Sequence, residues 1–250
     1  MPARQVATRP RPPAPADDWA LFLDVDGCLL DLADQPDAVR VPPRLRTTLQ
    51  ALGDRLGGAL ALVSGRPLAG LDALFAPARF SGAGLHGLER RNGNAGSPPP
   101  ERPVVMDAVR AEAHGIAARF PGALVEDKGV ALGLHWRGAP EAKESLRGFA
   151  EAALPRLPGY RLQHGNHVVE LRPDGGDKGN AIEALLAEPP FLGRVPVFAG
   201  DDITDESGFA VVNARAGISV LVGAREPSAA HFALPGPEAV RRWLIEGVAA

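Results

Sequence analysis

The apolar residues of this chain fall into short continuous runs that alternate with segments of helical spacing. Residues 20–23 form a first run, which stops at an acidic segment, and residues 59–63 form a second run, which stops at Ser64. Between them, residues 43–56 carry leucines three or four positions apart behind a proline-rich start, as in an amphipathic helix. A strand, a helix and a strand in this order predict two parallel strands of one sheet.

The pattern changes in the middle of the chain and then returns. A third short strand is expected near residues 79–84, and a loop rich in Gly, Pro and Asn follows at 92–103. The next stretch predicts a helix, two strands, a second helix and two more strands, at residues 104–120, 123–126, 130–137, 141–154, 160–163 and 167–172. After Pro173 the alternation resumes, with helices at 178–187, 205–212 and 237–248 and strands at 195–199 and 218–222.

These elements define the expected fold class. The core is α/β, a doubly wound parallel sheet of the Rossmann-like type, formed by residues 17–102 and 174–250. Residues 103–173 form an inserted α+β cap, or lid, domain. Residues 1–16 contain five prolines and three arginines but no acid, so we expect a disordered tail there.

Composition narrows the possible functions. Of the 250 residues, 45% are apolar and 23% are charged, as in a globular protein, and no apolar run approaches the length of a membrane span. The 27 basic and 30 acidic residues give a net charge of −3 and form no basic block, so we expect neither a nucleic-acid nor a membrane partner. No motif implies a protein partner. The single cysteine, Cys28, cannot form an internal disulfide, which favours a reducing, cytoplasmic setting.

Acidic residues gather where the predicted strands end. The chemistry of an open parallel sheet collects beyond the carboxyl ends of its strands, so these residues should lie close together. Several carboxylates repel one another unless a cation neutralises them, and an all-oxygen site suits Mg²⁺. Taken singly, each acid also fits a turn and Ser64 a helix cap, but an acidic pair that recurs after a second strand favours a metal site. The candidates are Asp24, Asp26, Ser64, Lys178, Asp201, Asp202 and Asp205.

The order of these residues resembles the haloacid-dehalogenase-type (HAD) phosphohydrolases. The four motifs of that superfamily are Asp-x-Asp, a Ser or Thr, a Lys and an acidic pair. Here they correspond to Asp24-Val25-Asp26, Ser64, Lys178 and Gly200-Asp201-Asp202. One residue departs from the pattern, because Cys28 stands where the superfamily usually has Thr or Ser. This removes a hydroxyl contact but leaves the backbone N–H groups of the loop at Gly27 to bind phosphate.

The resemblance implies a mechanism through a covalent intermediate. Asp24 would be the nucleophile that forms an aspartyl-phosphate, and Asp26 would protonate the leaving alkoxide and then take a proton from water. Ser64 would hydrogen-bond a phosphate oxygen, and Lys178 would screen the nucleophile from that phosphate. Asp205 would orient Lys178 or the metal site, unless it only caps a helix. The ligands of Mg²⁺ would be Asp24, the backbone carbonyl of Asp26, Asp201 and, directly or through water, Asp202.

The side chains of the predicted insert indicate which leaving group the site accepts. Its acids, amides and lysine suit the hydroxyls of a polyol phosphate, although charged residues on strands also form solvated faces. Motifs from Leu21 to about Leu244 are similar to those of the trehalose-6-phosphate phosphatases. They are Ser64-Gly65-Arg66, Gly84-x-His86-Gly87-x-Glu89, Glu126-Asp-Lys128, His135-aromatic-Arg137, Glu170-x-Arg172-Pro173 and Gly200-Asp201-Asp202-x-Thr204-Asp205-Glu206.

This second resemblance implies a role in trehalose biosynthesis, with trehalose 6-phosphate as the substrate. The residues that would grip the distal glucose are Glu126, Lys128 and Glu170, and Arg137 and Asn166 are weaker candidates. Arg66 and His86 lie on core loops and fit either a substrate contact or structural hydrogen bonds. Closure of the insert about hinges near residues 99–104 and 172–177 would exclude water.

Two alternatives stay open. The same chemistry could serve another sugar phosphate, such as sucrose 6-phosphate. A non-hydrolytic module that binds a sugar phosphate belongs to a different class of protein. The filled catalytic positions argue against such a module, and nothing in the sequence specifies the water-poor site of a phosphomutase.

Overall fold

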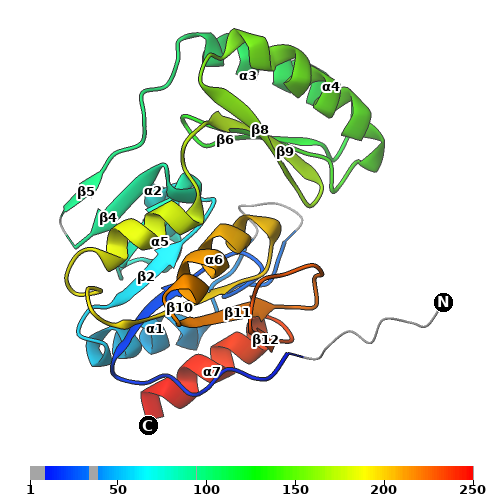
Figure 1. The fold of residues 1–250 in the computed structure, drawn as a ribbon. Coiled ribbons are helices and arrows are strands. Elements are labelled where there is room, and N and C mark those ends of the chain that lie inside the picture. Colours follow the sequence, from blue (N-terminus) through cyan, green and yellow to red (C-terminus); the bar gives the residue numbers. More distant parts are fainter. Residues whose placement is uncertain (1–8, 34–38, 94, 250) are drawn as a thin grey trace.

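The computed structural model describes residues 9–33, 39–93 and 95–249, which form two β-sheets (Figure 1). The strand order of the larger sheet is β12-β11-β10-β1-β2-β3-β4-β5. Its strands from β12 to β3 run parallel, whereas β4 and β5 are antiparallel additions at one edge. The strands are β1 (Trp19–Leu23), β2 (Leu60–Val63), β3 (Ser81–Gly84), β4 (Glu89–Asn92), β5 (Ala95–Ser97), β10 (Val195–Gly200), β11 (Ile218–Val222) and β12 (Phe232–Leu234).

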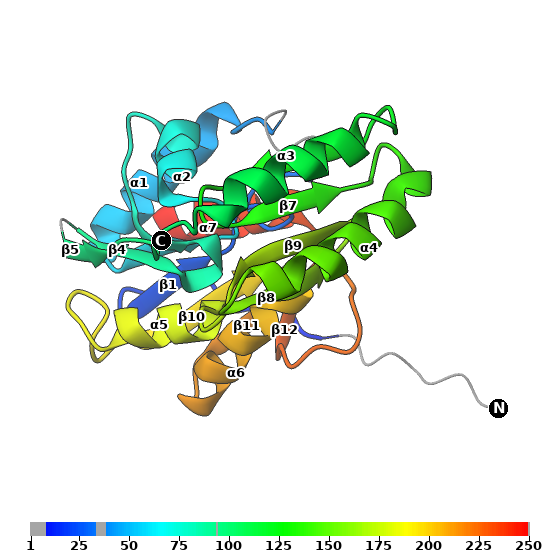
Figure 2. The same ribbon diagram turned by 90° about the horizontal axis from the view of Figure 1, so that it is seen from above.

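Helices cover both faces of the larger sheet (Figure 2). One face carries α1 (Pro43–Arg55), α2 (Leu68–Phe75) and α7 (Pro237–Ala249), and the other carries α5 (Lys178–Leu186) and α6 (Glu206–Ala214). The order of the strands reverses between β1 and β10, so the connections lead away from this point in both directions. The doubly wound α/β core is thereby confirmed, and its crevice lies beyond the carboxyl ends of β1 and β10. Within the described residues, no helix combines the length and the hydropathy needed to cross a bilayer.

The apolar run at residues 20–23 becomes the central strand of this sheet. β1 is buried along its whole length, as expected of a parallel strand with helices on both faces. α1 turns Leu45, Leu49 and Leu52 into the same core. Because β1 is fixed by packing on both sides, it delivers Asp24 to the edge of the sheet in a defined position.

The smaller sheet, with its helices, forms a unit that stands over the larger sheet, and we call it the cap (Figure 1). Its antiparallel order is β6-β7-β9-β8. The elements are α3 (Val105–Ala117), β6 (Leu124–Asp127), β7 (Leu132–His135), α4 (Lys143–Ala153), β8 (Tyr160–Gly165) and β9 (Val168–Pro173). Alternate strand residues point into a core shared with α3 and α4; they are Val125, Leu132, Leu134, Val169 and Leu171. The residues between them line the opposite face, toward the larger sheet.

Most of the predicted helices and strands lie within a few residues of their expected positions, but four short elements were not predicted. They are α2, β12 and the hairpin of β4 and β5, of which β5 lies inside the loop expected at 92–103. α2 has no capping side chain, and β5 and β12 have three residues each, so the local sequence carries little signal for them.

The N-terminal segment differs from the expected tail. Residues 1–8 lie outside the described part of the chain, but residues 9–16 run along the core. The carbonyl of Pro10 accepts the N–H of Ala233 at 3.0 Å, and Trp243 Nε1 donates to the carbonyl of Pro13 at 2.7 Å. The edge strand and α7 supply these donors, and an extended proline-rich segment supplies the carbonyls. Tertiary contacts, which composition does not reveal, therefore order this part of the segment.

Candidate active site

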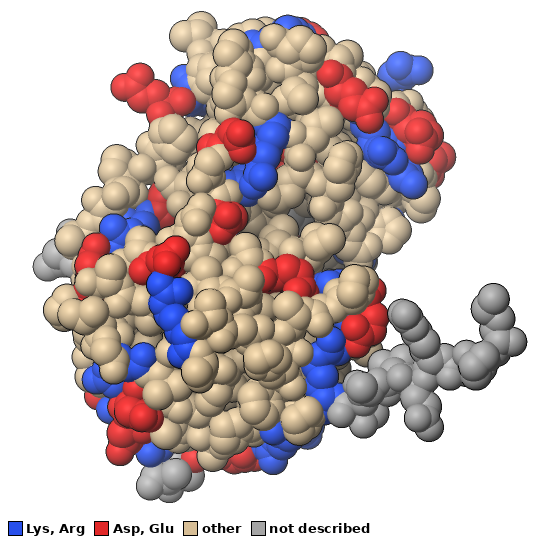
Figure 3. Space-filling model, in the orientation of Figure 1, with Lys and Arg blue, Asp and Glu red and all other residues tan. Residues whose placement is uncertain are grey.

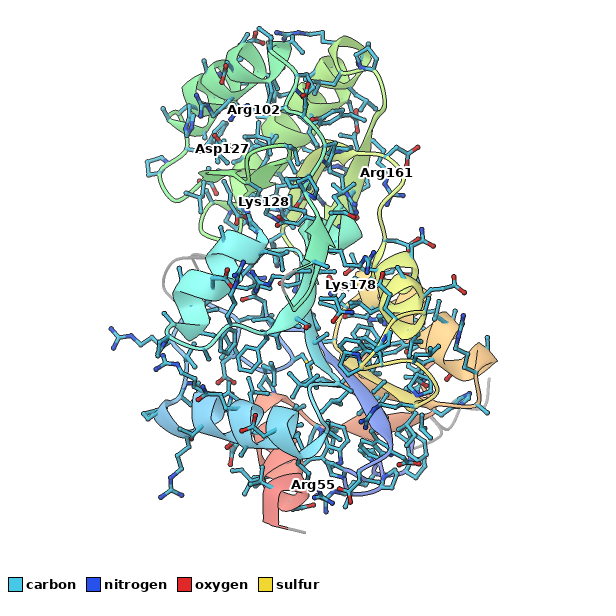
Figure 4. All side chains as sticks on the ribbon, turned by 90° about the vertical axis from the view of Figure 1, so that its left-hand side faces the viewer. Arg55, Arg102, Asp127, Lys128, Arg161 and Lys178 are labelled. Atoms are coloured by element: carbon cyan, nitrogen blue, oxygen red, sulfur yellow. The ribbon has the colours of Figure 1, made fainter. Side chains whose placement is uncertain are left out.

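A cleft of about 560 Å³ lies between the crevice of the larger sheet and the cap. The molecular surface is indented between the two units, and Lys128 of the cap faces the region of Lys178 in the core (Figures 3 and 4). The cleft lining includes Asp24, Asp26, Ser64, Arg66, His86, Glu126, Lys128, Arg137, Asn166, Glu170, Lys178, Asp201 and Asp202, all of them predicted site residues. The other two, Gly27 and Asp205, contact members of this lining from behind.

Lys178 joins two of the predicted acids. It begins α5 and is only 2% exposed, and its Nζ lies 3.0 Å from Asp24 Oδ1 and 2.7 Å from Asp205 Oδ1. Burial lowers the pKa of Lys178, but the charges of Asp205 and Asp24 outweigh this effect and raise the pKa well above its usual value. Burial also raises the pKa of Asp24, and Lys178 opposes that shift. Lys178 is therefore a fixed positive charge beside Asp24.

Asp205 fixes the loop that follows β10. It is fully buried, and its Oδ2 accepts the backbone N–H groups of Asp201 and Asp202, both at 2.9 Å. Its Oδ1 accepts the hydrogen bond from Lys178 at 2.7 Å. Both oxygens of Asp205 are thus engaged by donors, and the residue links the lysine to the acidic pair.

Asp201 is the acid best placed to hold a cation. Oxygens of Asp24, Asp201 and Asp205 lie within 4.8 Å of one another, and Asp201 Oδ1 is buried with no hydrogen-bond partner among the described residues. Burial, followed by repulsion from Asp205 and Asp202, raises the pKa of Asp201 to about 7. Asp202 Oδ1 accepts the N–H and the hydroxyl of Thr204, so this carboxylate also caps the turn that follows it. A cluster of carboxylate oxygens with one buried and unpaired fits a hard cation.

The carboxylate of Asp26 is bound by Arg66. Its Oδ2 lies 2.6 Å from Arg66 Nε, and its Oδ1 lies 2.8 Å from Arg66 Nη2. The backbone N–H of Arg66 donates to Ser64 Oγ at 3.1 Å. Two parallel hydrogen bonds from a guanidinium fix both the position and the direction of a carboxylate. Asp26 therefore presents its carboxylate to the cleft beside Ser64.

The loop after β1 requires glycine at one position and turns its cysteine away from the cleft. Gly27 has a φ of +82°, and a Cβ there would lie 2.2 Å from Asp201 Oδ2. Cys28 is fully buried, and its Sγ lies 3.4 Å from the carbonyl of Ala199 in β10. Burial raises the pKa of the Cys28 thiol well above its usual value. The side chain that departs from the superfamily pattern thus packs against the sheet.

The cap presents a charged group to the cleft. Lys128 Nζ lies 2.5 Å from Glu170 Oε2 and 3.8 Å from Glu126 Oε2, and His135 Nε2 lies 2.8 Å from Glu126 Oε2. Burial alone would lower the pKa of Lys128, but the charges of Glu170 and Glu126 outweigh it and raise the pKa. Glu170 Oε1 is buried and has no hydrogen-bond partner among the described residues. The cap therefore holds an oriented donor and an unpaired acceptor side by side.

A chain of hydrogen bonds connects the cap to the core at His86. Arg172 Nη1 donates to Gln163 Oε1 at 2.7 Å, and Gln163 Nε2 lies 3.1 Å from His86 Nε2. Because arginine only donates, the amide oxygen of Gln163 faces it and the amide nitrogen donates to His86. Burial, reinforced by the charge of Lys128, lowers the pKa of His86 well below its usual value. His86 is therefore neutral, with Nε2 as the acceptor.

Two polar side chains, from β8 and from the loop after β11, are among the cleft residues that the sequence reasoning missed. Gln163 and Arg225 both line the cleft, but neither belongs to a motif. The only signal for Gln163 is its alternation with Leu162, which packs into the cap core. Arg225 lies in the loop between β11 and β12 and carries no local signal.

The two weaker candidates of the cap, Arg137 and Asn166, lie together, because Arg137 Nη2 donates to the carbonyl of Asn166 at 3.3 Å.

The topology and the site together define a class of protein. A doubly wound parallel sheet with an acidic cluster and a buried lysine at its crevice, under an inserted cap, is the arrangement of a HAD-type phosphohydrolase. The C-terminal domain of C. albicans trehalose-6-phosphate phosphatase has the same fold, with a TM-score of 0.81 and 19% identity over 98% of this chain and 99% of that one.

Sequence comparison identifies the family within that class. The trehalose-phosphatase family profile matches residues 22–238. A probable trehalose-phosphate phosphatase of Sinorhizobium fredii is 47% identical over 227 residues, which cover 90% of this chain and 86% of that protein. The trehalose-6-phosphate phosphatase of Escherichia coli is 44% identical over 227 residues, covering 90% and 85%. The chain belongs to the trehalose-phosphatase family, and it is a phosphatase.

Proposed function

We propose that this protein hydrolyses trehalose 6-phosphate to trehalose and phosphate through an aspartyl-phosphate on Asp24. The observation that carries the proposal is the shared cleft: the buried pair of Asp24 and Lys178 lies beneath the charged group of Lys128 and Glu170. One end of the cleft thus suits a phosphate, and the other suits sugar hydroxyls. The high identity to trehalose-phosphate phosphatases of two bacteria supports the choice of sugar.

The chemistry divides into two displacements. An oxygen of Asp24 attacks phosphorus, the bond from phosphorus to the sugar oxygen breaks, and Asp26 gives its proton to the leaving alkoxide. Water then attacks phosphorus, Asp26 takes a proton from it, and free phosphate leaves as Asp24 is regenerated. Arg66 orients Asp26 in its ionised form, the form that takes a proton from the attacking water. Lys178 keeps its charge throughout and reduces the repulsion between Asp24 and the phosphate.

A cation completes the charge balance of the site. The ligands proposed for Mg²⁺ are Asp24, the backbone carbonyl of Asp26, Asp201 and, directly or through water, Asp202. When bound, Mg²⁺ supplies positive charge that offsets the charge on the transferring phosphoryl group. Ser64 binds a remaining phosphate oxygen, whereas the N–H of Gly27, which the sequence suggested for this role, donates to the carbonyl of Leu30 at 2.8 Å.

The cap recognises the sugar and controls the access of water to the site. Lys128 and the unpaired Glu170 Oε1 offer a donor and an acceptor to the distal glucose, with Glu126, Arg137 and Asn166 beside them. We place the cap at residues 103–173 and its hinges near 99–104 and 172–177. Cap closure brings sugar recognition to the nucleophile and excludes water from the first displacement.

The substrate and the cofactor are tested together by phosphate release. The wild type and Asp24→Asn are assayed on trehalose 6-phosphate, sucrose 6-phosphate and other sugar phosphates, with and without Mg²⁺. We expect metal-dependent release from trehalose 6-phosphate that is lost in the variant. Release from a different sugar phosphate would replace the substrate and keep the mechanism. If none of these sugar phosphates is hydrolysed, the proposed substrate class is wrong.

The role of the cap is tested by Lys128→Met. Losing a charged hydrogen bond to the sugar should lower kcat/KM for trehalose 6-phosphate by roughly 10- to 100-fold. Hydrolysis of p-nitrophenyl phosphate, which has no sugar, should change by less than about threefold. Lys143→Met is the matched control, because Lys143 is exposed on α4. Equal losses on both substrates would refute recognition by the cap.

A further inference from the structure

Arg225 makes an unusual set of contacts at the rim of the cleft. It lies in the loop between β11 and β12, and its guanidinium donates to the carbonyls of Asp201 at 3.4 Å and Asp202 at 3.1 Å. It also donates to the carbonyl of Pro227 at 2.6 Å and forms a hydrogen-bonded ion pair with Glu206. Arg225 thus contacts the backbone of both acids of the pair from a segment distant from either.

These contacts complete a clamp on the acidic pair. Asp205 Oδ2 accepts the N–H groups of Asp201 and Asp202 on one side. Arg225 donates hydrogen bonds to the carbonyls of the same two residues on the other side. With both kinds of backbone group held, the peptide unit between Asp201 and Asp202 is restrained, which fixes the point from which the Asp201 side chain extends toward Asp24.

The loop that carries Arg225 is itself anchored. Arg9, from the N-terminal segment, donates to the carbonyls of Ser228 at 2.8 Å and Ala230 at 2.7 Å, and it pairs with Glu226. Glu206 accepts the N–H of Ala229 at 2.8 Å while it pairs with Arg225. The guanidinium is therefore held in a fixed frame, and its charge is balanced by Glu206.

We propose that Arg225 is a positioning residue of the cation site, which fixes the backbone of Asp201 and Asp202 so that their carboxylates are ready to bind Mg²⁺. The proposal rests on the cation assignment made under the proposed function. Groups that orient metal ligands typically change metal affinity by 10- to 100-fold when they are lost. Lysine keeps the charge but cannot donate in several fixed directions at once, so Arg225→Lys separates orientation from electrostatics.

The test is calorimetric titration of the metal-free protein with MgCl₂, which needs no substrate. We expect Arg225→Lys to raise the Kd for Mg²⁺ about tenfold. Arg215→Lys, whose exposed side chain pairs with Glu183 away from the cleft, should leave that Kd unchanged. In the assay, Arg225→Lys should raise the Mg²⁺ concentration for half-maximal rate by the same factor. Its KM for trehalose 6-phosphate and its kcat at saturating Mg²⁺ should stay within about threefold of wild type.

Several results would overturn the proposal. An unchanged Kd for Mg²⁺ in Arg225→Lys would show that the clamp does not position the ligands. A raised KM for the sugar phosphate with an unchanged Kd would make Arg225 a substrate contact instead. If Arg225→Lys does not fold, Glu206→Gln, which removes the charged partner of Arg225, must weaken Mg²⁺ binding. A wild type that binds Mg²⁺ but hydrolyses no sugar phosphate would refute the proposed function alone, whereas one that binds no Mg²⁺ would overturn both.

Discussion

Replacing Gly27 by alanine separates backbone strain from displacement of a cation ligand. The Cβ of alanine at this position would lie 2.2 Å from Asp201 Oδ2, whereas ordinary contact begins near 3.4 Å, so this oxygen would have to move by roughly 1.2 Å. A misplacement of about 1 Å in a catalytic group can lower the rate roughly 100-fold. A positive φ, here +82°, costs a residue with a side chain about 1–2 kcal/mol in addition.

A matched glycine isolates the effect of the collision. Gly193 has a φ of +78°, and nothing lies within 4 Å of the Cβ that alanine would add there. Both Gly27→Ala and Gly193→Ala should therefore lose about 1–2 kcal/mol from backbone strain, which lowers the thermal midpoint by roughly 2–8 °C. Only Gly27→Ala should lose about 100-fold in kcat/KM for trehalose 6-phosphate. Similar activities of the two variants would show that Asp201 is free to move, and the reasoning would be wrong.

Two further predictions concern buried ionisable groups. Because burial lowers the pKa of His86, the unfolded chain binds a proton below pH 6.5 that the folded protein does not, so the free energy of unfolding decreases as the pH is lowered, by up to about 1.4 kcal/mol per pH unit. The free energy of unfolding is measured in urea between pH 6.5 and 5. His86→Gln should remove this part of its dependence on pH, and an unchanged dependence would contradict the lowered pKa of His86. Asp205→Asn places an N–H donor against Lys178 or against the backbone N–H groups that Asp205 accepts. The free energy of unfolding should fall by about 3–5 kcal/mol, which lowers the calorimetric midpoint by roughly 6–20 °C. Asp31→Asn, at an exposed ion pair, should change stability by less than about 1 kcal/mol, and equal midpoints would refute the buried role.

The sequence alone determined the order of most elements and the identity of most cleft residues. These signals are local: an apolar run of strand length, a helical spacing of leucines, and an acidic pair directly after a strand all lie within a few residues. Parallel topology then requires that the ends of the strands meet, so Asp24 and Asp201 could be placed together although 177 positions separate them. The Glu126 and Lys128 pair followed from the resemblance of short motifs.

The tertiary structure decided what each side chain touches. Composition predicted disorder for a proline-rich segment, yet residues 10 and 13 accept hydrogen bonds from Ala233 and Trp243, which lie more than 200 positions away. The direction of Cys28, which packs toward β10, also depends on how the loop folds against a neighbouring strand. Gln163 and Arg225 belong to no motif and enter the cleft only because of the strand or loop that carries them. Local spacing specifies which face of an element a residue occupies, but the partner on that face is set by how distant elements pack.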